Sequence, residues 1–189
     1  MRAPAVAAVA AVAAMLSRLA VLAALALGAP AMLGGCGGTE RRAPSLIPAA
    51  GAAPLPPLAY RLLTGEPWSS SAAAGRVLVI DVWATYCKPC REAFPKLNRL
   101  AAAYPDAAVI GLSLDEDDAV VRAFLAEVPA AYPIARDPKL SVQTGPLRLT
   151  KLPTLLVVDR RGRLRLRAEL LHEADYDALP GLVAALLAE

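Results

Sequence analysis

The segment VLVIDVWATYCKPC, from Val77 to Cys90, joins an apolar run directly to a Cys-x-x-C pair. Its first part, Val77 to Trp83, is apolar apart from one aspartate, which is typical of a strand buried at the centre of a sheet. Two thiols at this spacing, on the first turn of a following helix, can close a small disulfide that reopens on reduction. The segment therefore predicts a redox reaction centre at the end of a central strand.

The two cysteines are expected to have different roles. Cys87 lies at the predicted N-terminus of the helix, where unpaired backbone N–H groups and the positive end of the helix dipole stabilise a thiolate. Pro89 fits the first turn, where no backbone N–H is needed, and Lys88 adds a positive charge that favours the anion. We therefore expect Cys87 to be the nucleophile. Cys90, one turn further along and more buried, is the expected resolving thiol.

Two other uses of the cysteine pair are a purely structural disulfide and half of a zinc site. Zinc would need two further ligands, and the rest of the domain offers only His172 and carboxylates, without the paired spacing usual for such sites. We therefore expect no metal and no cofactor, with the Cys87–Cys90 disulfide itself as the redox group.

Asp81 lies inside the apolar strand, six residues before Cys87. A buried carboxylate is costly unless it has a partner or a task, and burial raises its pKa. Asp81 is therefore a candidate acid–base residue. The alternative is a carboxylate that is satisfied by hydrogen bonds or that faces solvent. Glu92 is expected to face solvent in the first turn of the helix, where the dipole stabilises it.

Periodicity along the remaining chain predicts one α/β domain, from Leu58 to Glu189, with a central mixed sheet flanked by helices. Strands are expected at Ala59 to Leu63, Val77 to Trp83, Ala107 to Leu114, Leu155 to Asp159 and Arg163 to Leu170. Helical segments are expected at Cys87 to Tyr104, Glu116 to Val128, Asp137 to Thr144 and Ala174 to Ala188.

Two separated motifs resemble the thioredoxin superfamily. They are Trp83-Ala-Thr-Tyr-Cys87-Lys-Pro-Cys90 and, about sixty residues later, Leu152-Pro153-Thr154. Within the superfamily the chain is most similar to the membrane-tethered TlpA/ResA-like thiol:disulfide oxidoreductases. The resemblance implies a thioredoxin-like fold and exchange of disulfides with protein substrates. It also implies that Asp81 accepts the proton of Cys90, and that a cis Leu152–Pro153 bond faces the Cys87 sulfur.

Residues around the cysteine pair are expected to contact the substrate. Tyr86, Lys88 and Pro89 flank the thiols, and the resemblance implies that Leu152 and Pro153 pair with an extended substrate segment. Trp83 is expected to pack in the core, with a second role as a wall of the substrate site. In the hairpin, the nearly alternating arginines are expected to form a solvated face: Arg160, Arg161, Arg163, Arg165 and Arg167.

The first 35 residues are apolar and rich in alanine, which is typical of a secretory signal. Leu33-Gly34-Gly35-Cys36 resembles the bacterial lipobox, which implies a signal peptide over residues 1–35 and lipidation of Cys36. An ordinary cleaved signal or a membrane helix, with Cys36 a spare thiol, is the alternative, and translation can start at Met1 or Met15. Residues 36–57, rich in proline and alanine, are expected to form a tether.

These features together predict a periplasm-facing lipoprotein of the bacterial cell envelope. The resemblance to lipoprotein signals implies retention in the inner membrane when an aspartate follows the cysteine, so Gly37 and Gly38 slightly favour the outer membrane. The net charge of +3 is too small to indicate nucleic acid, and a monomer is expected. Expected partners are envelope proteins with disulfides or thiols and, if the protein acts as a reductant, a membrane electron donor. Cytochrome c maturation and copper-centre assembly are candidate uses; the alternative function is a copper-binding metallochaperone, and peroxide reduction is disfavoured.

Overall fold

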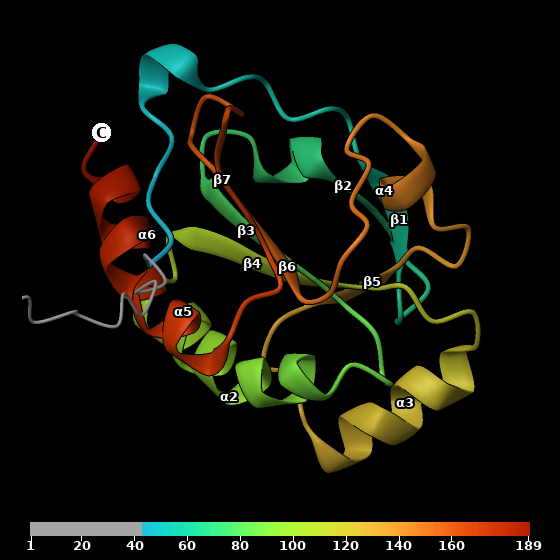
Figure 1. Ribbon diagram of the computed structural model, residues 1–189. Coiled ribbons are helices and arrows are strands. Elements are labelled where there is room, and N and C mark those ends of the chain that lie inside the picture. The colour runs from blue at the N-terminus through green and yellow to red at the C-terminus, as the bar shows by residue number, and fades with distance from the viewer. Residues whose placement is uncertain (1–42) are drawn as a thin grey trace, which may run out of the picture. The chain divides into compact units, whose positions relative to one another are not determined.

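The computed structural model describes residues 43–189, which form a sheet with helices on both faces (Figure 1). The sheet has seven strands in the order β2-β1-β5-β4-β3-β6-β7. Their bounds are β1 Ala59–Leu62, β2 Pro67–Ser69, β3 Val77–Trp83, β4 Ala107–Ser113, β5 Ile134–Arg136, β6 Thr154–Val158 and β7 Leu164–Glu169. Parallel and antiparallel pairs both occur, so the predicted mixed α/β sheet is confirmed.

Strand β3 lies inside the sheet, parallel to β4 and antiparallel to β6. Every residue of β3 is buried, as expected for an apolar run with a neighbour on each side and helices above and below. The register places Asp81 beside Gly111 of β4 and Leu155 of β6. The cysteine pair follows immediately after the carboxyl end of β3, where the chain turns into helix α2.

Seven helical segments accompany the sheet within the described residues. Their bounds are η1 Ala49–Gly51, η2 Ser70–Ala73, α2 Lys88–Ala103, α3 Asp118–Glu127, α4 Ser141–Thr144, α5 Glu173–Asp177 and α6 Leu179–Leu187. Helices α2, α3, α5 and α6 pack against the β3 face that carries Val77, Val79 and Trp83, where the larger core lies. Segments η2 and α4 contribute to a second core on the opposite face, with Leu78, Ile80 and Val82.

Apart from the short helices η1 and η2, which were not predicted, three elements differ from the predictions. Strands β2 and β5 were not expected, because a run of three residues is too short to show a period of two. The expected helix from Ala174 to Ala188 is divided into α5 and α6. Pro180 lies in the first turn of α6, a position that suits proline, whereas one continuous helix would place it in the interior.

Residues 46–57 do not form the tether that their proline content predicts. Leu46 packs against the larger core. The segment runs antiparallel to the outer edge of β7, with backbone hydrogen bonds Ile47 N–Arg165 O of 2.6 Å, Leu164 N–Ala53 O of 2.8 Å and Leu55 N–Gly162 O of 2.9 Å. Proline removes a donor but leaves the carbonyl acceptors, so the segment can still cover a strand edge. The domain boundary predicted at residue 58 is therefore too late.

The hairpin arginines do not form one solvated face. Arg165 is buried, and its guanidinium binds Asp159 and Glu189, while its Nε donates to the carbonyl of Ile47 at 2.7 Å. Arg163 is half-buried and binds the same aspartate. The alternation predicted one exposed side of the strand, but residues 46–55 pair with its edge, and the carbonyls of Ala49 and Ile47 accept hydrogen bonds from Arg163 and Arg165.

Within residues 43–189, no helix is long and apolar enough to cross a membrane. The predicted signal peptide, residues 1–35, and the predicted lipidation site, Cys36, lie outside the described residues.

Candidate active site

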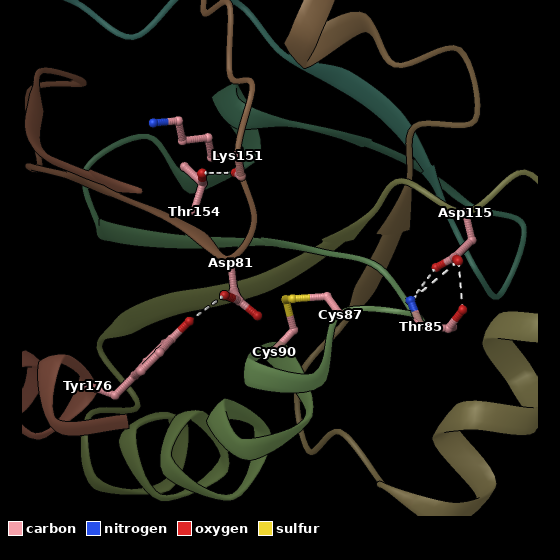
Figure 2. Close-up of a disulfide and its surroundings, with 8 residues drawn as sticks. All are labelled: Asp81, Thr85, Cys87, Cys90, Asp115, Lys151, Thr154 and Tyr176. Carbon is pink, nitrogen blue, oxygen red and sulfur yellow. Dashed lines mark hydrogen bonds between the residues drawn. A yellow bond between two sulfur atoms is a disulfide. The ribbon is translucent and has the colours of Figure 1, made fainter. Parts of the chain in front are cut away.

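Cys87 and Cys90 form a disulfide at the start of α2, with an S–S bond of 2.02 Å and a Cα–Cα distance of 5.3 Å (Figure 2). Cys87 is the N-cap residue of the helix, and its carbonyl accepts hydrogen bonds from the amides of Cys90 and Arg91. Pro89 occupies the first turn, as predicted. The exposed fraction is 7% for Cys87 and 0% for Cys90, so the expected difference in burial is confirmed.

The position of Cys87 determines its chemistry once the disulfide is reduced. Its sulfur is then at the N-terminal end of a helix of 16 residues, where the dipole and unpaired backbone N–H groups stabilise a thiolate. The side chains of Lys88 and Glu92 are both exposed, so neither charge is fixed against the sulfurs by burial. The solvent-facing position predicted for Glu92 is confirmed.

Asp81 is completely buried beneath the disulfide. Its carboxylate lies between the Tyr176 hydroxyl and the two sulfurs (Figure 2). The hydroxyl donates a hydrogen bond of 3.4 Å to Oδ1, and Oδ2 has no hydrogen-bond partner among residues 43–189. Burial raises the pKa of Asp81 to about 7, although the hydrogen bond from Tyr176 acts to lower it. The carboxylate can therefore take up and release a proton near neutral pH.

A second carboxylate, Asp115, holds the loop that leads to Cys87 (Figure 2). It accepts hydrogen bonds from the Thr85 amide at 3.0 Å and the Thr85 hydroxyl at 2.7 Å. The Ser113 hydroxyl donates to it at 2.9 Å, and a guanidinium nitrogen of Arg136 donates to its backbone carbonyl at 2.6 Å. This network fixes the backbone two residues before Cys87.

Asp115 was not among the residues expected at the site. The sequence does contain a feature that points to this residue, since Asp115 directly follows the predicted strand Ala107 to Leu114. The carboxyl ends of neighbouring parallel strands meet at one edge of a sheet, and β3 and β4 pair in this way. The acidic run from Asp115 to Asp118 looks solvated, however, and only the register identifies the member that turns inward.

The Leu152–Pro153 peptide bond is cis, as the resemblance implies. Pairing of Thr154 with Val82 places the bond at the same end of the sheet as the disulfide. Pro153 is buried and Leu152 is half-buried. The carbonyl of Pro153 accepts a hydrogen bond from the Leu170 amide at 2.8 Å, which joins this turn to the end of β7.

The two aromatic residues near the site, Trp83 and Tyr86, differ in burial. Trp83 is completely buried and packs against Phe94 and Phe124, with ring centroids 4.8 and 4.9 Å away. Its expected core role is confirmed, whereas a wall of the substrate site would need an exposed surface that Trp83 does not have. Tyr86 has an exposed fraction of 78%, so its ring is available to a partner.

No group of three or more histidine, cysteine, aspartate or glutamate side chains in the described part of the chain is arranged to hold a metal ion. His172, which the sequence analysis considered as a ligand, is exposed and is the N-cap residue of α5.

The amino-acid sequence matches a known protein family. The sequence model of the AhpC/TSA family matches residues 52–167, more than half of the chain. The chain belongs to the AhpC/TSA family. The match begins before residue 58, in agreement with the packing of residues 46–57 against β7.

Individual relatives agree with this assignment. The chain is 31% identical over 111 residues to the thioredoxin-like protein YneN of Bacillus subtilis (strain 168), covering 57% of this chain and 64% of that protein. It is 30% identical over 92 residues to the thiol-disulfide oxidoreductase ResA of Bacillus thuringiensis (strain Al Hakam), covering 48% of this chain and 53% of that protein. The chain therefore spans between about half and just under two thirds of these two relatives.

The thioredoxin-like fold is confirmed by solved structures. A thiol:disulfide interchange protein DsbE from Chlorobium tepidum matches with a TM-score of 0.68 and 32% identity. The match covers 72% of this chain and 96% of that structure. The TlpA/ResA-like resemblance of the two motifs is thus supported over nearly the whole of a related domain.

Proposed function

We propose that this chain is a thiol:disulfide oxidoreductase that exchanges the Cys87–Cys90 disulfide with cysteines of other proteins. One observation carries the proposal: a closed disulfide has one sulfur at a helix N-terminus and the other buried beside a carboxylate whose pKa is about 7. A structural disulfide has no need of such a carboxylate, because burying it without a cation is unfavourable. The names of ResA and DsbE, to which the chain is similar, agree with the proposal.

In the reducing direction, the Cys87 thiolate attacks one sulfur of a substrate disulfide. A bond forms between Cys87 and that sulfur, and the other substrate sulfur leaves as a thiolate. Cys90 then transfers its proton to Asp81, and the resulting thiolate attacks Cys87 and releases the second substrate sulfur. The substrate gains two electrons and the Cys87–Cys90 pair loses them. The oxidising direction follows the same steps in reverse.

The substrate is proposed to dock on the exposed surface around the sulfurs. Tyr86, Lys88 and Pro89 are exposed on one side, and half-buried Leu152 lies at the same end of the sheet together with Pro153. An apolar rim of this kind suits an extended or locally unfolded segment that brings a cysteine with it. The side chain of Tyr86 offers the largest apolar contact.

The proposed location is the periplasmic side of a bacterial membrane, with acylated Cys36 as the anchor and the outer membrane favoured. Proposed partners are envelope proteins that contain disulfides or thiols, in cytochrome c maturation or copper-centre assembly, with a membrane electron donor if the chain is a reductant. Labelling with a radioactive fatty acid tests the anchor, since Cys36→Ser abolishes the label if Cys36 is acylated.

The function is tested with Cys90→Ser, which leaves the nucleophile but removes the resolving thiol. Mixed disulfides between Cys87 and envelope proteins are expected to accumulate, while the matched variant Cys87→Ser is expected to trap far fewer. A redox titration of the wild type against glutathione gives the potential. Absence of mixed disulfides together with stoichiometric retention of copper would contradict the proposal and support the metallochaperone.

A further inference from the structure

Tyr176 brings the last part of the chain into contact with the candidate active site. It lies in α5, is almost completely buried in the larger core, and donates its hydroxyl proton toward Oδ1 of Asp81 over 3.4 Å. The two residues are 95 positions apart in the sequence. In Figure 2 the hydroxyl and the disulfide lie on different sides of the carboxylate, so Tyr176 can contact Asp81 without blocking Cys90.

Helix α5 is held against α2 by surface charges. The Lys96 ammonium of α2 binds the Asp177 carboxylate at 2.6 Å and the Glu173 carbonyl at 2.9 Å. At the start of α5, the Asp175 carboxylate accepts a hydrogen bond from the His172 amide at 2.7 Å, completing a capping box. These contacts fix a helix of only five residues and, with it, the direction of the Tyr176 hydroxyl.

The titratable groups around Asp81 come from three parts of the chain. The sulfurs of Cys87 and Cys90, at the start of α2, and the Tyr176 hydroxyl of α5 lie beside its carboxylate (Figure 2). Tyr132, from the segment between α3 and β5, interacts electrostatically with Asp81 and has a buried hydroxyl without a hydrogen-bond partner among residues 43–189. Gly111 and Leu155, the neighbours of Asp81 on β4 and β6, carry no charge. Within the described residues no lysine or arginine forms an ion pair with Asp81. Tyr176 is therefore the one side chain of this set that donates a hydrogen bond to the carboxylate.

Both tyrosines remain neutral at neutral pH, because burial and then the nearby Asp81 charge raise their pKa well above the ordinary value. A neutral donor stabilises the ionised carboxylate more than the protonated one. The hydrogen bond from Tyr176 thus opposes the effect of burial on the pKa of Asp81.

We propose that Tyr176 is a positioning residue, which holds the Asp81 carboxylate and stabilises its charged form so that it accepts the proton of Cys90 at neutral pH. The proposal rests on the proposed function for its role in exchange, but not for its effect on Asp81. It assigns to α5 a part in the resolving step that neither the Cys-x-x-C motif nor Leu152-Pro153-Thr154 indicates.

The test replaces Tyr176 by phenylalanine, which keeps the ring and removes the hydroxyl. The Asp81 carboxyl carbon is titrated by NMR in the oxidised protein, where the cysteines do not titrate, and Asp81→Asn identifies its signal. The midpoint is expected to rise by roughly 0.5 to 1 pH unit, the size of one modest hydrogen bond. The pH profile of the resolving step is expected to move by the same amount in the same direction.

Tyr132→Phe is the matched control, because it removes a buried hydroxyl from the same core without removing a hydrogen bond to Asp81. In this variant the titration midpoint of Asp81 is expected to stay within about 0.2 pH units of the wild-type value. An unchanged midpoint in Tyr176→Phe, or an equal rise in Tyr132→Phe, would overturn the inference. If Tyr176→Phe does not fold, Lys96→Met loosens α5 instead and is expected to give a smaller rise; no rise there would also count against the inference.

The two proposals fail in different ways. A raised Asp81 midpoint in a protein that exchanges no disulfides would leave the positioning role intact and remove the proposed function. Normal exchange by Tyr176→Phe, with an unchanged pH profile and an unchanged carboxyl titration, would leave the proposed function intact and remove the positioning role of Tyr176.

Discussion

Two buried aspartates lie toward opposite ends of the same sheet and have contrasting surroundings. Asp81, near the disulfide, receives one hydrogen bond of 3.4 Å from Tyr176. Asp159 follows β6 at the far end, where it binds the guanidinium groups of Arg163 and Arg165 and accepts hydrogen bonds from two backbone amides. The exposed fractions are similar, 0% and 4%.

The protonation of the two groups differs accordingly. Burial alone acts to raise both pKa values. For Asp159, hydrogen bonds from the Arg163 amide and guanidinium and from the Arg161 amide outweigh burial, so its pKa is lowered. For Asp81 burial prevails and the pKa is about 7. Burial therefore does not decide whether a carboxylate serves structure or proton transfer; the donors within hydrogen-bond distance decide it.

The largest expected effect is on exchange in Asp81→Asn. The amide cannot accept the proton of Cys90, so the resolving step is expected to slow by about 10²- to 10⁴-fold, the usual contribution of a general base. Attack by Cys87 should change far less. Rapid mixing with a substrate disulfide separates the two steps through the lifetime of the mixed disulfide. An unchanged lifetime at pH 7 would remove Asp81 from the mechanism and with it the contrast to Asp159.

The pH dependence of stability is expected to have opposite signs at the two sites. The pKa of Asp81 rises from 3.8 to about 7 on folding. Its contribution to the free energy of unfolding is therefore present at low pH and is lost as pH rises from about 4 through about 7. The loss is as much as ~4 kcal/mol in the free energy of unfolding, and Asp81→Asn should abolish it. The contribution of Asp159, whose pKa is lowered, is present at neutral pH and lost as pH falls through its folded value.

Urea denaturation of the wild type, Asp81→Asn and Asp159→Asn between pH 3 and pH 8 measures these contributions. Asp81→Asn is expected to gain stability relative to the wild type as pH rises, and Asp159→Asn to lose it. A constant difference between Asp81→Asn and the wild type across this range would mean that Asp81 keeps an ordinary pKa in the folded protein.

A smaller effect is expected for Arg165→Met. The substitution keeps much of the apolar stem but removes a charge that binds Asp159 and Glu189. Asp159 retains Arg163, so the free energy of unfolding should fall by roughly 2 to 3 kcal/mol, less than when a buried carboxylate is left with no cation at all. Exchange by the folded protein should not change. Exposed Arg161 provides the control, since Arg161→Met is expected to cost less than about 0.5 kcal/mol; an equal loss in both variants would contradict the prediction.

The local features of the site could be predicted because each depends on neighbouring residues. An apolar run interrupted only by Asp81 specified the buried strand β3, and that one acidic residue indicated a raised pKa. The spacing of Cys87 and Cys90 specified a disulfide at a helix start. The cis bond before Pro153 was accessible only through the family resemblance, since most X-Pro bonds are trans.

The features that were missed depend on contacts between distant parts of the chain. Strand β5 has three residues and exists because β1 and β4 pair with it on either side. The composition of residues 46–57 is that of a linker, yet β7 offers donors and acceptors along its edge. Asp115 turns inward because parallel pairing brings it to the loop that contains Thr85.

The sequence by itself thus indicated the candidate reactive residues, because helix dipole, thiol spacing and the cost of a buried charge are local properties. Only the tertiary structure decided what surrounds them. Tyr176 contacts Asp81, and Arg165 joins Ile47 to Asp159, across separations that no local pattern encodes. The physical reason is that the ionisation of a buried carboxylate depends on donors within a few ångströms, and folding of the whole chain brings those donors into place.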